Sequence, residues 1–151
     1  MKKILFLVAL SLMAASTFAQ SEKKQSKKGK KTEQRLEPLK IIFQLTTNDS
    51  LSHKALMKQL GNITSVEPET KIEVVCHGPG LDMLRSDKSI VTKKINEFAS
   101  KGVVFSACEF SMKERNVTAA EIIPSVGFVK AGIIHIVRQQ QAGWFYIKSG
   151  F

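Results

Sequence analysis

Residues 102–112 read GVVFSACEFSM, and this stretch decides how the rest of the chain is interpreted. Val103–Ala107 is a short apolar run after a glycine, which predicts a strand buried inside a sheet. Cys108 ends that strand, and the polar residues 109–116 that follow are able to form a helix. A thiol at the start of a helix lies near free backbone N–H groups, which favour the thiolate. Cys108 is therefore the first candidate for a functional residue.

The sequence on either side of this stretch alternates between apolar runs and amphipathic segments. Apolar runs predict further strands at residues 40–45, 71–76, 125–129 and 144–148. Caps and apolar stripes predict helices at residues 50–60, 90–100 and 131–143, with short helical turns at 81–85 and 118–121. Gly61 and Asn62 are expected to end the first helix. This order predicts a three-layer α/β/α fold, with helices on both faces of a mostly parallel five-stranded sheet.

The first 19 residues have the pattern of a cleavable signal peptide. Lys2 and Lys3 precede an apolar run at residues 4–15, and small residues stand at Thr17 and Ala19. The run is shorter than the roughly 20 residues that a membrane-spanning helix needs, and no later stretch is long and apolar enough. We therefore expect no membrane span and a periplasmic or secreted protein.

Residues 20–38 form a lysine-rich segment with seven basic and three acidic side chains, which we expect to be a disordered spacer. The whole chain carries a net charge of +10. The two lysines of the signal peptide account for +2 and the spacer for +4, which leaves +4 for the predicted domain at residues 39–151. In an exported protein a basic tail is interpreted as a solvated spacer, so we do not expect nucleic acid as a partner.

Candidate site residues gather where the predicted strands end. In open α/β sheets the working site lies at the carboxyl ends of the strands. Asn48 and Asp49 follow the first strand, His77 follows the second, and Cys108 ends the third. We expect these side chains to lie at one edge of the sheet, with His77, Asn48 and Asp49 supporting Cys108.

The two cysteines, Cys76 and Cys108, each allow more than one interpretation. A free cysteine is often a small buried apolar residue, and this applies most to Cys76, which ends an apolar strand. Cys108 is either such a residue or a reactive thiol. Export also allows a Cys76–Cys108 disulfide, provided that their strands are neighbours.

Metal, cofactor and hydrolase chemistry find little support in the sequence. Cys76 and His77 are adjacent strand residues that point to opposite faces, so they make a poor ligand pair, and we expect no metal site. The GPG run at residues 78–80 lacks the further residues of a phosphate-binding loop, and we expect no cofactor. Ser106 and Ser111 lack the context of a hydrolase nucleophile. His53 and His135, on predicted helices, are interpreted as structural.

Three motifs together resemble the DsrE/DsrF-like family, in particular its stand-alone members. They are HGPGL at residues 77–81, the stretch at 102–112, and Ile123-Pro124 followed by the Gly132 helix and WFYIK at 144–148. The resemblance covers residues 40–148 and implies a three-layer α/β/α fold and homo-oligomers, often trimers or hexamers. In the sulfur-relay members a cysteine accepts sulfur as a persulfide and passes it on. Cys108 stands where this branch carries its cysteine.

Three functions remain open at this point. The first is an exported sulfur-carrier or thiol-transfer protein that uses Cys108, with a thiol-bearing protein or a small sulfur donor as partner. The second is a binding or assembly module of the cell envelope without enzymatic activity. The third is a redox sensor that works through a Cys76–Cys108 disulfide.

The signal-peptide interpretation predicts that the exported chain begins at Gln20, because cleavage follows Ala19. N-terminal sequencing of the protein recovered from the periplasm of a bacterial expression host checks this. The variant Ala19→Arg, which places a large charged residue at the cleavage site, should remain unprocessed. Recovery of a chain that still begins at Met1, in the cytoplasm and unprocessed, would contradict the prediction.

Overall fold

The computed structural model describes residues 37–150, so the predicted signal peptide and nearly all of the lysine-rich segment lie outside the described residues. Within these residues, five strands form one sheet in which every neighbouring pair is parallel and the order is β4-β3-β2-β1-β5. The strands are β1 (Lys40–Leu45), β2 (Lys71–Cys76), β3 (Val104–Cys108), β4 (Gly127–Val129) and β5 (Phe145–Ser149). The predicted fold class is confirmed.

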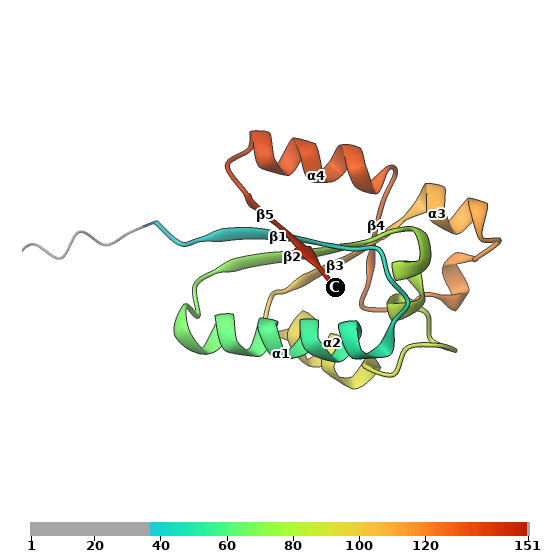
Figure 1. Cartoon of the computed structure of the whole chain (residues 1–151), viewed down its shortest axis with the longest axis horizontal. Helices are drawn as coiled ribbons and strands as arrows, with labels where there is room; N and C mark the ends of the chain where they lie inside the picture. Colours follow the sequence, from blue (N-terminus) through green and yellow to red (C-terminus); the bar gives the residue numbers. More distant parts are fainter. Residues whose placement is uncertain (1–36, 151) are drawn as a thin grey trace, which may run out of the picture. The chain divides into compact units, whose positions relative to one another are not determined.

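Helices cover both faces of the sheet, as expected from right-handed crossovers. The helices α1 (Ser50–Val66) and α2 (Thr92–Ser100) lie on one face, and α4 (Gly132–Gln141) lies on the other (Figure 1). The short helix α3 (Glu109–Glu114) and the 3₁₀ helices η1 (Gly78–Leu84) and η2 (Ala119–Glu121) follow the ends of strands or connect elements. None of the helices within residues 37–150 combines the length and apolarity needed to cross a bilayer.

The two faces of the sheet are packed very differently. The face toward α1 and α2 carries one large cluster of buried apolar side chains, including Phe43, Val74 and Phe105. The face toward α4 carries a small cluster whose buried members are Ile42, Val75 and Ile136. Because successive strand residues alternate between faces, β1 and β2 contribute to both clusters. Most of the apolar burial that stabilises the fold therefore lies on the side of α1 and α2.

The first helix differs from its predicted length, because α1 continues through Gly61 and Asn62 to Val66. Gly61 faces the Phe98 ring of α2, and a Cβ atom built at Gly61 would lie 3.8 Å from Phe98 Cζ. Glycine and asparagine favour the end of a helix, but contact with α2 continues here and α1 continues with it. The expected cap at the other end is present, since the Asp49 carboxylate accepts a hydrogen bond from the Ser52 N–H at 2.7 Å.

The loop after β2 is fastened to the end of β1. The His77 N–H donates to the Leu45 carbonyl oxygen at 3.1 Å. Gly80 lies so close to β1 that an added Cβ would be 2.2 Å from the same oxygen, a distance at which no side chain fits. Gly78 has a φ of 54°, which glycine adopts without strain. The two glycines therefore let η1 start directly above the sheet and place His77 at its carboxyl edge.

Candidate functional site

Cys108 lies where β3 ends and α3 begins, and it is the residue at the N-cap position of α3. Only 4% of the residue is exposed. The N–H of Gly132, in the first turn of α4, donates to Cys108 Sγ at 3.2 Å. The sulfur therefore lies at the start of α3 and accepts a hydrogen bond from the start of α4.

The pKa of Cys108 lies below the usual value of a cysteine. Burial is the largest single influence and acts in the opposite direction, since it disfavours the charged form. It is outweighed by hydrogen bonds from the Ser111, Gly132 and Phe110 N–H groups and from the Ser111 hydroxyl. The site therefore favours the thiolate, which is the nucleophilic form of cysteine.

His77 and Cys108 lie at the same edge of the sheet, and both side chains line one cavity. The Gln44 side-chain amide N–H donates to His77 Nε2 at 2.7 Å, and the Tyr146 hydroxyl donates to Gln44 Oε1. Since an amide nitrogen can only donate, His77 Nε2 is the acceptor and the ring proton lies on Nδ1. Burial lowers the pKa of His77, so the ring is neutral at neutral pH.

His77 and Cys108 have different hydrogen-bond partners. The ring of His77 bonds to Gln44, and the Cys108 sulfur accepts from the Gly132 N–H of α4. The neutral His77 ring lines the cavity, and its hydrogen bond with the Gln44 side chain fixes its orientation. The expectation that His77 supports the thiol stays a prediction, because the two side chains line the same cavity but bond to different groups.

The cavity in front of Cys108 has a volume of about 400 Å³, within the range of small-molecule sites. Among the described residues that line it, there is one carboxylate, from Glu114, and no lysine or arginine. The lining residues are His77, Cys108, Phe110, Ser111, Glu114, Ala131, Gly132, Ile133 and Ile134. The Glu109 carboxylate is engaged elsewhere, because Lys130 Nζ lies 3.3 Å from its Oε2 at an exposed position.

Asn48 and Asp49 do not join this cavity. Asp49 is engaged at the start of α1, where the Ser52 N–H and the Ser52 hydroxyl donate to its carboxylate at 2.7 and 2.8 Å. These bonds, the hydroxyl first and the N–H second, lower the pKa of Asp49. Asn48 is exposed in the same loop. The loop follows β1, which is separated from β3 by β2, so sharing an edge does not bring these side chains to Cys108.

Cys76 is separated from Cys108 by the sheet itself. Cys76 pairs in register with Ala107, and both belong to the cluster that faces α1 and α2, whereas Cys108 faces α4. Both thiols are free. Cys76 has no exposed surface, and burial raises the pKa of its thiol well above the usual value. The two sulfur atoms leave neighbouring strands in opposite directions, so this arrangement gives a Cys76–Cys108 bridge no geometric support.

The sequence analysis did not assign Gly132, Gln44 or Ser111 to the site. Gly132 lies 24 positions after Cys108, and only its place at the start of a predicted helix gave it any prominence. A Cβ at Gly132 would lie 3.2 Å from Val75 Cγ1 and 3.4 Å from the Cβ atoms of Cys108 and His77. A glycine therefore suits this position because α4 meets the sheet there.

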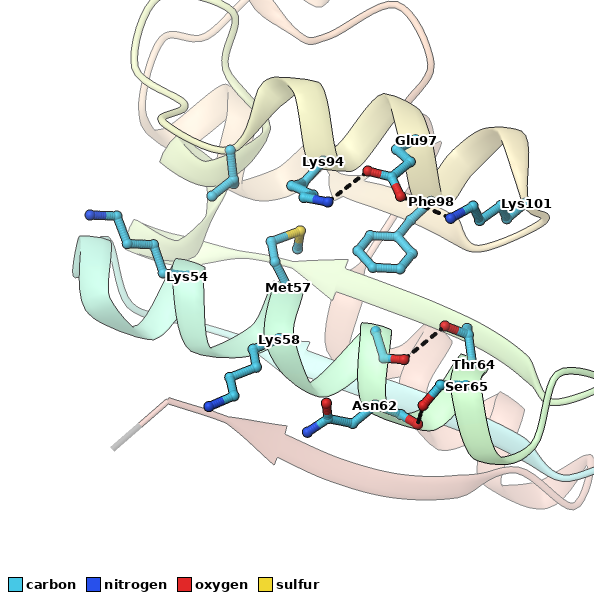
Figure 2. Close-up of a pocket in the computed structure, with 12 residues that line it drawn as sticks. Lys54, Met57, Lys58, Asn62, Thr64, Ser65, Lys94, Glu97, Phe98 and Lys101 are labelled. Carbon is cyan, nitrogen blue, oxygen red and sulfur yellow. Dashed lines mark hydrogen bonds and ion pairs between the residues drawn. The ribbon is translucent and has the colours of Figure 1, made fainter.

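A larger groove lies between α1 and α2, on the opposite side of the sheet from Cys108 (Figure 2). It has a volume of about 750 Å³, and Met57 and Phe98 lie between the two helices. Lys94 and Lys101 both form ion pairs with Glu97 at 2.8 Å. These three charged side chains of α2 are therefore paired with one another. Neither a thiol nor a histidine is among the described residues that line this groove, so its size does not make it the better candidate for chemistry.

Among residues 37–150, no three histidine, cysteine, aspartate or glutamate side chains gather in an arrangement that suits a metal ion. His53 is held in place by a hydrogen bond from its Nε2 to the Thr47 carbonyl oxygen at 2.9 Å. The chemistry best supported by the described part of the chain is therefore that of a thiol with a lowered pKa beside a largely uncharged cavity.

The model of the DsrE/DsrF-like family matches residues 9–148. The chain belongs to the DsrE/DsrF-like family. The solved structure of a protein of unknown function, MTH1491 from Methanobacterium thermoautotrophicum, has a TM-score of 0.70 and 28% identity, and the match covers 73% of this chain and 98% of that one. No protein of curated function matches the sequence significantly.

Two further solved structures share the fold at lower identity. A conserved protein of unknown function, BT1422 from Bacteroides thetaiotaomicron, has a TM-score of 0.58 and 19% identity, covering 72% of this chain and 93% of that one. The ychN protein from E. coli has a TM-score of 0.62 and 10% identity, covering 74% and 99%. At these identities the likeness concerns the fold, which extends over nearly the whole of each of the two structures.

The lowered pKa of Cys108 predicts selective alkylation by iodoacetamide near neutral pH. The rate at Cys108 should rise with pH and reach half its maximum below about 8.5, the pKa of an unperturbed cysteine. Ser111→Ala removes one donor to the sulfur and should reduce the rate at pH 7 about threefold. Peptide-level mass spectrometry measures Cys108 separately from Cys76, which should stay unmodified in the native protein.

The matched control for this experiment is Ser125→Ala, which removes an exposed hydroxyl that is bonded to Asn96, at 2.7 Å. Its rate profile should coincide with that of the wild type. A half-maximal rate at or above about pH 8.5 in the wild type would show that the donors do not outweigh burial.

Proposed function

We propose that this protein is a sulfur carrier whose working residue is Cys108. The observation that carries the proposal is a nearly buried thiol that lines a cavity and accepts a hydrogen bond from the Gly132 N–H at 3.2 Å. The neighbouring N–H groups and the Ser111 hydroxyl also lower its pKa. A cysteine that serves only as a small apolar residue needs none of these donors. Membership of the DsrE/DsrF-like family supports the same interpretation, since in its sulfur-relay members a cysteine carries the sulfur.

The proposed reaction is an exchange at sulfur. The Cys108 thiolate attacks the outer sulfur of a donor persulfide R–S–SH. The donor S–S bond breaks, R–S⁻ leaves with the electron pair, and Cys108 becomes Cys–S–SH. An acceptor thiolate then attacks the same outer sulfur, which restores the Cys108 thiolate. Each step breaks one S–S bond and forms one, so no external oxidant or reductant is needed.

The lining of the cavity favours donors without strong negative charge. Glu114 contributes a carboxylate, and the other lining side chains are apolar or neutral, apart from the Cys108 thiolate itself. The lysine beside the site, Lys130, lies against the Glu109 carboxylate instead of in the cavity. A doubly charged anion such as thiosulfate would lose its hydration without gaining a cationic partner. A persulfide whose alkyl group is uncharged, or one delivered by a protein, carries at most one negative charge and meets a smaller cost.

Incubation with a low-molecular-weight persulfide whose alkyl group is uncharged should add the mass of one sulfur atom to Cys108. Intact-protein and peptide mass spectrometry measure the addition. Cys108→Ser should abolish it, whereas Cys76→Ala should keep it, since Cys76 does not line the cavity. Thiosulfate should load the protein much more slowly than the persulfide.

Absence of the sulfur adduct on a Cys108 thiol that alkylation shows to be free would end the sulfur-carrier proposal. In that case the module without enzymatic activity and the redox sensor are the interpretations that remain. For the module, Cys108→Ser should leave binding and stability unchanged. The redox-sensor interpretation needs a Cys76–Cys108 bridge, and peptide mapping without reduction after oxidation detects it.

We also propose that copies of this chain associate through the outer face of α4. The solvent face of a helix that packs on a sheet is normally polar. Here Ile133, Ile134 and Val137 form an apolar stripe on that face and are 61%, 60% and 45% exposed. Ile133 and Ile134 also line the cavity, so a second copy on this face would close the mouth of the site. In the trimers or hexamers that the family resemblance implies, a second copy could cover this apolar face.

Val137→Lys should dissociate the proposed oligomer, because it places a charge in the apolar contact. Light scattering coupled to size-exclusion chromatography measures the mass. Val66→Lys, at an exposed valine at the end of α1, is the matched control and should keep the mass of the wild type. A monomeric wild type, or an oligomer that survives Val137→Lys, would exclude this face as the contact.

The compartment is part of the proposal as well. The pattern of residues 1–19 supports export, and a sulfur carrier outside the cytoplasm would meet donors and acceptors of the cell envelope. The free state of both thiols is compatible with an oxidising compartment, because Cys76 is inaccessible in the core and faces away from Cys108.

A further inference from the structure

A buried carboxyl group lies between the sheet and α4, outside the cavity. Glu73 stands in the middle of β2, and its residue is only 5% exposed. Burial of such a group is costly unless hydrogen bonds replace its water. The sulfur chemistry proposed for Cys108 makes no use of Glu73, and nothing in the local sequence KIEVVC requires an acid at this position.

Three side chains replace the water around Glu73. The Ser106 hydroxyl, from β3, donates to Glu73 Oε1 at 2.8 Å. His135 Nε2 lies 2.8 Å from the same oxygen, and the Gln139 side-chain N–H donates to Oε2 at 3.2 Å. When Glu73 is ionised, its oxygens only accept, so His135 Nε2 is then the donor of this bond. We refer to Glu73, Ser106, His135 and Gln139 as the Glu73 cluster.

The cluster joins one turn of α4 to the sheet. His135 and Gln139 are four residues apart and therefore lie one above the other on the same side of the helix. Their side chains hold the two oxygens of one carboxyl group, which fixes α4 both along and across the sheet. The apolar contact beneath α4 is small, with Ile136 as the helix residue in the buried cluster. The polar contact therefore adds a second attachment of this helix to the sheet.

The same helix supplies a donor to the thiol. Gly132 lies one turn before His135, and its N–H reaches Cys108 Sγ at 3.2 Å. The fit at this point is close, since an added Cβ at Gly132 would lie 3.4 Å from Cys108 Cβ. Hydrogen bonds weaken rapidly when the donor moves away or turns aside. The position of α4 on the sheet therefore decides whether this bond to sulfur exists.

We propose that Glu73 and His135 are positioning residues, which hold α4 at the place on the sheet where the Gly132 N–H meets the Cys108 sulfur. They lie outside the cavity, have no hydrogen bond to the sulfur, and act through the helix. The inference rests on the proposed function to the extent that Cys108 is the working thiol. It concerns a property of the thiol itself, so it can be tested without any sulfur donor.

The test is the pH profile of Cys108 alkylation in Glu73→Gln, read by peptide mass spectrometry. The new side-chain amide would present an N–H group where His135 or Gln139 needs an acceptor, so α4 should shift or loosen. The thiol pKa should then rise by about 0.5 to 1 unit, which lowers the rate at pH 7 about three- to tenfold and leaves the limiting rate at high pH nearly unchanged. Exchange of the amide hydrogens of α4 should become faster in parallel.

The sign of the shift separates positioning from a direct electrostatic effect. Removal of a negative charge near a thiol stabilises the thiolate and lowers its pKa. Positioning through α4 predicts the opposite, a rise. His135→Gln should raise the thiol pKa as well, and the double variant should raise it by no more than the larger single change, because both residues act through one contact.

The matched control is Glu97→Gln, which makes the same chemical change on α2, on the other face of the sheet. Its alkylation profile should coincide with that of the wild type. His135→Gln, at a side chain that is partly exposed, carries the test if Glu73→Gln does not fold. A folded variant of either kind whose thiol pKa is unchanged or lowered would overturn the proposal.

The positioning role and the sulfur-carrier function fail separately. A wild type that does not accept sulfur, together with a raised thiol pKa in Glu73→Gln, would remove the sulfur-carrier function and leave the positioning role in place. If the wild type accepts sulfur but Glu73→Gln leaves the thiol pKa unchanged, the sulfur-carrier function stands and the positioning role is removed.

Discussion

The close approach of α4 to the carboxyl end of the sheet, at Gly132, is the contact on which the site depends. A Cβ atom at this position would lie 3.2 Å from Val75 Cγ1, so a residue without a side chain lets the helix start there without displacing its neighbours. The first turn of α4 then completes the set of donors around Cys108 and forms one wall of the cavity. The thiolate, the cavity and the position of α4 are therefore parts of one arrangement.

The two faces of the sheet contribute differently: one supplies most of the apolar burial, and the other carries the candidate site. The face toward α1 and α2 buries a continuous apolar cluster, which supplies most of the hydrophobic stabilisation and includes the inaccessible Cys76. The face toward α4 has little apolar contact and instead holds polar groups, namely Gln44, Glu73, His77 and Ser106, in hydrogen bonds. One strongly packed face lets the other carry a buried carboxyl group, a neutral histidine and a thiol with a lowered pKa.

Strand ends can be recognised in the sequence, but only some of the residues predicted from them line the cavity. Cys108 and His77 were predicted to share an edge, because alternation and strand ends can be counted along the chain. Asn48 and Asp49 obey the same rule but lie beside β1, and only the strand order shows that β2 separates them from β3. In addition, the Asp49 carboxylate is engaged by Ser52 at the start of α1, a local contact that competes with any role at the site. The continuation of α1 past Gly61 likewise depends on contact with α2, which no local propensity contains.

Patterns among neighbouring residues were enough to assign the α/β class, the five strands, the DsrE/DsrF-like family and the place of one cysteine at a strand end. Which groups surround that cysteine depends on how distant elements pack together. Gly132 lies 24 positions after Cys108, Glu73 lies before it on another strand, and their roles arise only when α4 packs on the sheet. A hydrogen bond depends on distance and direction in space, and these are set by packing between elements that the linear order of residues does not specify.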